Sequence, residues 1–207
     1  MVPRGPAGDS GNPARDVREE DSFDVGAVAA WLRGHAEPAF AHVVAGTPEV
    51  RQFPGGASNL TYLLRYPEGD LILRRPPSGT KAKGAHDMGR EYRVQAALAP
   101  VFPRVPAMVG LCEDESVIGS DFYVMEKVDG VIPRRELPFE LPSEQVSQLC
   151  ENALDVLIAL HSVDVSKSPA LAALGKGEGY VDRQMGGWMT RFGNARTDDT
   201  GDWSDVV

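Results

Sequence analysis

Apolar and polar residues alternate along the first half of the chain with the two-residue period of β-strands. Such runs lie at about 48–53, 59–66 and 70–75, and the segment PEGD at 67–70 supplies turn residues before the third run. Two further runs rich in β-forming residues, VPAMVGLCED and DFYVMEKVDG, are separated by an acidic turn. The pattern predicts five strands, three before a helix and two after it.

Four segments show the 3.6-residue period of amphipathic helices, at 25–33, 87–99, 143–161 and 179–192. Asp24 is a suitable cap for the first of them. The third has the strongest stripe, formed by Val146, Leu149, Cys150, Ala153, Val156, Leu157 and Leu160. The sequence ends with Trp203, Val206 and Val207, and no following element could cover them or the stripe of Trp188 in the last segment. A helical layer needs a second layer to bury it. The pattern therefore predicts the beginning of a helical domain whose remainder is absent.

Composition and charge narrow the classes of partner. The chain has 207 residues, of which 42% are hydrophobic and 25% charged, as in globular proteins. A net charge of −9 without a dense run of Lys or Arg argues against nucleic acid. No apolar run approaches the roughly 20 residues that cross a bilayer, and the first residues lack the apolar core of a secretory signal. We therefore expect a cytoplasmic protein without a membrane or nucleic-acid partner.

The cysteines and histidines give no sign of a metal site. Cys112 and Cys150 are far apart in apolar surroundings, which predicts packed thiols in a reducing compartment. The four histidines form no ligand pattern, and His161 is better explained as a helix-terminal residue than as a general base. We expect no metal ligand within this chain.

Candidate chemistry begins with the glycines of the segment FPGGASNLTYLL. Gly55 and Gly56 lack a Cβ and allow the backbone to close over a ligand, and Ala57 is followed by the hydrogen-bonding side chains of Ser58 and Asn59. A flexible loop over a β-ribbon, with a cation on the next strand, is how kinase-type folds hold the phosphates of a nucleotide. Alone, such a segment is more often an ordinary hairpin turn.

The strand at 70–75 and the helix at 87–99 supply a cation and a carboxylate. Strand alternation places Ile72 and Arg74 on one face, so Arg74 could reach phosphate oxygens while Ile72 lies under the base. Glu91 on the helix could orient the arginine, because a guanidinium pairs well with both carboxylate and phosphate. The alternative is that Arg74 and Glu91 are solvated surface charges.

The segment FYVMEKVDG has the character of an adenine-binding hinge between two lobes. Main-chain groups of Glu126 and Val128 would meet the adenine edge, with Met125 beside the base. In their order and separations, FPGGASNLTYLL, LILRRPP, GREYRVQAAL, FYVMEKVDGVI, ALHSVD and GYVDRQMGGWMTRF resemble the aminoglycoside phosphotransferase-like, or choline kinase-like, branch of the protein-kinase fold. The similarity is greatest to phosphotransferase domains associated with acyl-CoA dehydrogenases.

The resemblance covers about residues 23–203 and implies an α+β, protein-kinase-like fold. Its N-terminal lobe would be a five-stranded antiparallel sheet with one main helix, followed by an incomplete helical lobe. The implied divisions are a disordered tail at 1–22, a nucleotide-binding lobe at 23–128, a hinge and connector at 129–142, and the beginning of a helical lobe at 143–207.

The implied activity is ATP-dependent transfer of the γ-phosphate to the hydroxyl of a small molecule, with Mg²⁺ as the metal cofactor. The residues expected to bind ATP are Gly55, Gly56, Ala57, Ser58, Asn59, Ile72, Arg74, Glu91, Met125, Glu126 and Val128. Two features depart from the family: arginine replaces the usual strand lysine at Arg74, and the chain has no HGD-x-x-x-x-N segment and no later metal-binding Asp. We therefore expect no catalytic residue in this chain, Mg²⁺ ligands only in the missing part, and no activity from this chain alone.

Two other functions stay open. The chain could be a non-catalytic nucleotide-binding or interaction module, or half of a split enzyme. Self-association, or a complementing chain bound through the helices of 143–207, would then be expected. A Rossmann dehydrogenase is excluded because the glycine loop joins two strands instead of a strand and a helix, and a Walker-A NTPase is excluded because no GK[ST] segment is present.

Overall fold

The computed structural model describes residues 14–54, 59–77, 87–132, 137, 139–175, 177–197, 199 and 201. The contacts divide the chain into two compact units, Met1–Val163 and Asp164–Val207. The sequence places the boundary between lobes in the connector 129–142, whereas the contacts place it after Val163. The assignment of 143–207 to a single helical lobe stays a prediction.

A single antiparallel sheet forms the centre of the first unit, with the strand order β1-β2-β3-β5-β4. Its strands are β1 (Glu49–Gln52), β2 (Leu60–Tyr66), β3 (Gly69–Arg75), β4 (Met108–Cys112) and β5 (Phe122–Glu126). The α+β fold class and all five predicted strands are confirmed. Because β5 pairs with β3, Tyr123 lies beside Arg74 and Met125 lies beside Ile72.

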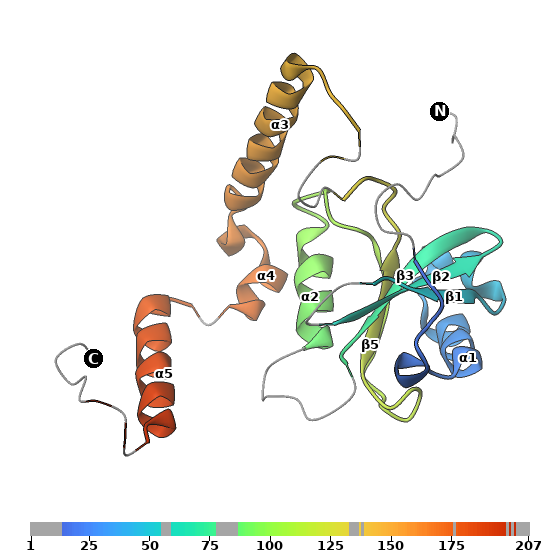
Figure 1. Ribbon diagram of the computed structural model, residues 1–207, viewed down its shortest axis with the longest axis horizontal. Helices are drawn as coiled ribbons and strands as arrows, with labels where there is room; N and C mark the ends of the chain where they lie inside the picture. Colours follow the sequence, from blue (N-terminus) through green and yellow to red (C-terminus); the bar gives the residue numbers. More distant parts are fainter. Residues whose placement is uncertain are drawn as a thin grey trace. The chain divides into compact units, whose positions relative to one another are not determined.

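Helices α1 (Val25–His35) and α2 (Met88–Leu98) lie on opposite sides of the sheet (Figure 1). Each begins at an aspartate that accepts a hydrogen bond from a main-chain N–H: Asp24 from Ala27 at 2.9 Å, and Asp87 from Arg90 at 2.7 Å. Three short 3-10 helices, Glu19–Asp21, Pro38–Phe40 and Val43–Ala45, complete the α1 side.

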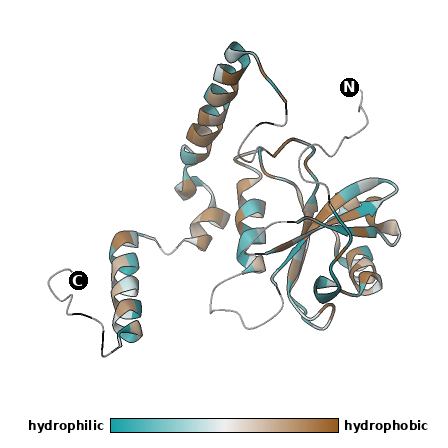
Figure 2. Ribbon diagram, viewed as in Figure 1, coloured by the Kyte–Doolittle hydropathy of each residue, from teal (hydrophilic) through white to brown (hydrophobic). Residues whose placement is uncertain are grey.

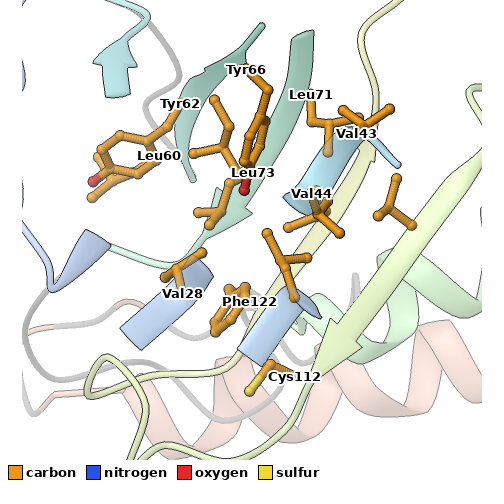
Figure 3. Close-up of a cluster of buried hydrophobic side chains, with 14 residues drawn as sticks. Val28, Val43, Val44, Leu60, Tyr62, Tyr66, Leu71, Leu73, Cys112 and Phe122 are labelled. Carbon is orange, nitrogen blue, oxygen red and sulfur yellow. The ribbon is translucent and has the colours of Figure 1, made fainter. Parts of the chain in front are cut away.

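The hydrophobic core lies on the side of the sheet that faces α1. Figure 3 shows Val28 of α1 grouped with side chains from the strands, among them Leu73 and Phe122. Alternate residues of β3 divide between the two faces, since Leu71 and Leu73 belong to this core and Ile72 and Arg74 do not. The predicted alternation along β3 is therefore confirmed, and Arg74 belongs to the face on the α2 side.

The predicted disordered tail at 1–22 is wrong for residues 14–22, while 1–13 lie outside the described residues. Arg15 exchanges two main-chain hydrogen bonds of 2.8 Å with Gln52, at the free edge of β1. The Asp21 carboxylate accepts from the Gln52 side chain at 2.7 Å, and the Asp21 carbonyl accepts from Tyr62 and Arg75 at 2.7 Å each. The segment is charged, but it satisfies buried polar groups of the sheet and is ordered for that reason.

The helix predicted at 143–161 is α3 (Ser143–His161), and Figure 2 shows several hydrophobic residues along it in brown. Leu149 and Leu157 of the predicted stripe are 45% and 47% exposed. The prediction of packed thiols is correct for Cys112, which is buried, and wrong for Cys150, which is exposed because no described residue covers this face of α3.

The second unit contains a 3-10 turn (Val165–Lys167), α4 (Pro169–Leu174) and α5 (Tyr180–Ala195). Its apolar side chains on α5 are exposed, namely Val181, Met185, Trp188, Met189 and Phe192. Among the helices that the structure describes, none combines the length and the apolar character that crossing a membrane requires.

Candidate functional site

A pocket of about 450 Å³ lies on the face of the sheet opposite the core. Strands β3 and β5 and helix α2 supply its walls, through the residues Arg74, Arg90, Glu91, Val94, Gln95, Tyr123 and Met125. Arg74, Tyr123 and Met125 come from adjacent strands that pair in register, and the other four come from one side of α2. The pocket therefore depends on α2 packing beside the paired strands.

Arg74 and Glu91 form the charged centre of the pocket, with a separation of 3.3 Å between Arg74 Nη2 and Glu91 Oε2. The two side chains face each other, and each is about two-thirds buried. Two further groups donate to the carboxylate: Asn59 Nδ2 to Oε1 at 2.7 Å and the Tyr123 hydroxyl to Oε2 at 3.0 Å.

The Arg74 guanidinium fits an anionic ligand. Its Nε atom is buried and makes no hydrogen bond within the described part of the chain. A buried N–H without a partner is costly, and an oxygen of a phosphate could satisfy it with a charge-assisted hydrogen bond. The closest approach of Glu91 to the guanidinium is 3.3 Å, between Arg74 Nη2 and Glu91 Oε2. A guanidinium has more N–H donors than one carboxylate can take, so donors are left for such a ligand.

A sequence model described as the phosphotransferase enzyme family matches residues 49–201. The chain belongs to this family. The match begins at β1 and includes every residue that lines the pocket.

Relatives of this phosphotransferase chain include two acyl-CoA dehydrogenase family members. The mouse acyl-CoA dehydrogenase family member 10 is 39% identical over 154 residues, which are 73% of this chain and 14% of that protein. The chicken family member 11 is 37% identical over 178 residues, 86% of this chain and 22% of that protein. The chain therefore spans less than a quarter of the length of the curated relatives it matches.

The fold also matches the crystal structure of a "putative aminoglycoside phosphotransferase" from Ralstonia eutropha. The TM-score is 0.63 at 36% sequence identity, and the match covers 86% of this chain and 50% of that one. The kinase-like phosphotransferase fold expected from the sequence is confirmed.

Tyr123 and Gln95 also line the pocket but were not predicted as site residues. Gln95 Nε2 lies 3.3 Å from the Tyr123 hydroxyl, and the same nitrogen lies 3.3 Å from the Glu91 carbonyl. Burial raises the pKa of Tyr123 to about 12, so its hydroxyl keeps the proton that it donates to Glu91. The two-residue period of β5 could have indicated Tyr123, because it places this residue on the same face as Met125.

The other predicted site residues occupy different positions around the pocket. Gly55, Gly56, Ala57 and Ser58 lie outside the described residues. Asn59 is described, is buried, and donates to the Glu91 carboxylate. Ile72 is buried and lies next to Met125 in the sheet. Glu126, the last residue of β5, and Val128, two residues later, are both exposed.

A magnesium site is not formed by the residues that the structure describes. No group of three or more His, Cys, Asp or Glu side chains gathers among them in a way that could hold a metal ion. Glu91, the acidic residue of the pocket, is occupied by Arg74, Asn59 and Tyr123. These residues fit a phosphate better than a divalent cation.

Proposed function

We propose that the pocket beside Arg74 holds phosphates of ATP, and that this chain supplies the nucleotide-binding part of an ATP-dependent phosphotransferase. The acceptor would be a hydroxyl group of a small molecule. The observation that carries the proposal is the Arg74–Glu91 pair on the wall of the pocket, together with Arg74 Nε, which is buried and has no partner among the residues that the structure describes. Membership in the phosphotransferase enzyme family supports it.

Each predicted residue has a role that follows from its chemistry. Arg74 compensates phosphate charge with a planar set of donors, and Glu91 restricts its orientation. Met125 and Ile72 offer apolar surface to the base, and main-chain groups of Glu126 and Val128 offer hydrogen bonds to the adenine edge. Phosphoryl transfer requires mainly positioning and charge compensation, so these contacts contribute to the reaction and not only to affinity.

The loop residues Gly55, Gly56, Ala57 and Ser58 would cover the phosphates, because two adjacent glycines allow close approach of the backbone. Arginine in place of the usual lysine exchanges a compact charge for a fork that can bind two oxygens at once. A contact of this kind suits a phosphate group that presents several oxygens.

The 207-residue chain contains no HGD-x-x-x-x-N segment, and no metal site occurs among the described residues. We therefore expect it to bind ATP without transferring phosphate by itself. Mg²⁺, when present, would compensate charge on the phosphates, through ligands that the described residues do not supply. A non-catalytic nucleotide-binding module is the second candidate function. The absence of an HGD-x-x-x-x-N segment favours it.

The names of the curated relatives favour an acyl-CoA-related acceptor over an antibiotic. A hydroxylated acyl group carries the alcohol that such a reaction needs. The name of the structural relative favours an aminoglycoside instead. Phosphorylation assays with both classes of alcohol, on a full-length relative, would decide between them.

Calorimetric titration with ATP tests the nucleotide site directly. Replacement Arg74→Ala should weaken binding about 10- to 100-fold, as expected from the loss of charge-assisted hydrogen bonds. Arg93→Ala is a matched control, because Arg93 is on α2 but pairs with Glu113 at 3.1 Å outside the pocket. Wild-type protein that does not bind ATP, or that binds it equally well after Arg74→Ala, would overturn the proposal.

An assay of phosphate transfer separates the two candidates. The 207-residue chain with Mg-ATP and a small alcohol should release no ADP above background. Turnover that disappears in Arg74→Ala would show that this chain alone is a catalyst, and would contradict the expectation of inactivity.

A further inference from the structure

We infer that Tyr123 and Asn59 are positioning residues that hold Glu91 away from a closed pairing with Arg74, so that the guanidinium stays available for phosphate. This role rests on the proposed function and adds to it the groups that control the arginine. Both residues reach Glu91 from outside α2, Tyr123 from β5 and Asn59 from the start of β2.

The Glu91 carboxylate lies closer to its two neutral donors than to Arg74. An unrestrained pair of arginine and carboxylate tends to form two parallel hydrogen bonds of about 2.7–2.9 Å. Here the closest approach between the two groups, from Arg74 Nη2 to Glu91 Oε2, is 3.3 Å. Asn59 donates to Oε1 at 2.7 Å and Tyr123 donates to Oε2 at 3.0 Å, so the two shorter contacts of the carboxylate are with neutral donors.

Tyr123 is itself held in place for this contact. Its side chain is 1% exposed, and Gln95, one helical turn after Glu91, contacts its hydroxyl at 3.3 Å. Gln95 can donate to this oxygen, which leaves the hydroxyl proton for Glu91. The tyrosine therefore acts on the carboxylate from a fixed position and adds no charge of its own.

The position of Glu91 determines whether Arg74 is available to an anion. With Glu91 held by Tyr123 and Asn59, the closest distance from the carboxylate to the guanidinium is 3.3 Å, and Arg74 Nε stays buried without a partner among the described residues. Without these donors, Glu91 would move closer to the guanidinium and would compete with an incoming phosphate. The two neutral donors thus convert a closed ion pair into one that can accept an anion.

Titration of ATP and of adenosine, followed by NMR, tests this role. Tyr123→Phe should weaken ATP about tenfold, the typical effect of one hydrogen bond to a charged group, and leave adenosine unchanged. Adenosine has no phosphate and so reports on folding and on the base site alone. Asn59→Ala removes the second donor and should weaken ATP in the same direction.

Tyr92→Phe is the matched control. Tyr92 lies on α2 with its ring 6.3 Å from that of Tyr123, and its hydroxyl is not one of the donors to Glu91. This variant should bind both ligands as the wild type does. Thermal denaturation of each variant checks folding, and Asn59→Ala decides the question if Tyr123→Phe is unfolded.

The outcomes separate this role from the proposed function. Unchanged ATP affinity in Tyr123→Phe, with affinity lost in Arg74→Ala, would overturn the positioning role and leave the nucleotide site intact. An equal loss for ATP and adenosine would show that Tyr123 only maintains the fold, which also overturns the role. If the wild type does not bind ATP, the proposed function and this role both fail.

Discussion

Three buried tyrosines of the sheet differ in what their hydroxyl groups contact. The Tyr62 hydroxyl donates to the Asp21 carbonyl at 2.7 Å, and the Tyr123 hydroxyl donates to Glu91 at 3.0 Å. The Tyr66 hydroxyl is buried without a hydrogen-bond partner in the part of the chain that the structure describes. The same side chain thus stabilises the fold, supports the site or carries a cost, depending on its neighbours.

Replacement of Tyr66 by Phe should increase the free energy of unfolding by about 1 kcal/mol at pH 7, because an unpaired buried hydroxyl is removed. Burial raises the pKa of Tyr66 to about 12. In the unfolded chain the pKa of a tyrosine is about 10. The stability that comes from the higher pKa of Tyr66 in the folded state is fully present below about pH 10, and it is lost as the pH rises from about 10 toward 12. The advantage of Tyr66→Phe should therefore grow between pH 10 and pH 12.

Urea denaturation over this pH range measures the effect. Tyr62→Phe is the control, since it loses a made hydrogen bond and should lower stability by about 1 kcal/mol at pH 7. A decrease in stability for Tyr66→Phe at pH 7 would mean that its hydroxyl has a partner after all.

At the scale of elements, α2 decides the geometry of the site. Glu91 and Gln95 are one turn apart on this helix, and Asp87 fixes its first residue through the hydrogen bond from the Arg90 N–H. Helix α1 has an equivalent cap at Asp24 but faces the core on the other side of the sheet. Loss of either cap should destabilise a helix, but only the cap of α2 lies on a helix that lines the pocket.

Asp87→Ala and Asp24→Ala should each lower the free energy of unfolding by about 1 kcal/mol, the usual effect of losing an N-cap. Only Asp87→Ala should also weaken ATP binding, because it loosens the turn that carries Glu91. Chemical denaturation and calorimetric titration of the same two variants provide the comparison. Equal ATP affinities for both would contradict a role of this cap in the site.

For the whole molecule, the prominent feature is apolar surface on helices of both units. Leu157 and Ile158 of α3 are 47% and 61% exposed, and Trp188 of α5 is 63% exposed. Clustered apolar side chains in contact with water favour association, whereas a net charge of −9 opposes it. We expect association to prevail as protein concentration and salt concentration rise.

Replacement of Leu157 and Ile158 together by Glu should reduce this association without unfolding the sheet, because both side chains are exposed. Sedimentation velocity at several protein concentrations measures it. Gln148→Glu adds charge to an exposed polar position of the same helix and should have a smaller effect. A wild-type chain that stays monomeric at high salt would show that these faces do not associate.

The five strands, α1 and α2 could be predicted because alternation and helical periodicity are local properties of the sequence. The same local pattern placed Arg74 and Ile72 on one face of β3, and the order of the motifs brought Glu91 into the hypothesis. Residues 14–22 were predicted wrongly, because their composition shows charge and does not show that Asp21 satisfies buried groups of the sheet.

What the sequence determined by itself is the set of elements, their faces and the chemical character of the residues on them, since these depend on neighbours a few positions away. What only the tertiary structure decided is which of those faces meet. Pairing of β5 with β3 brings Tyr123 beside Arg74, and packing of α2 brings Glu91 to both. These contacts join residues about 17 to 49 positions apart, and long-range contacts of this kind follow from packing and not from local periodicity.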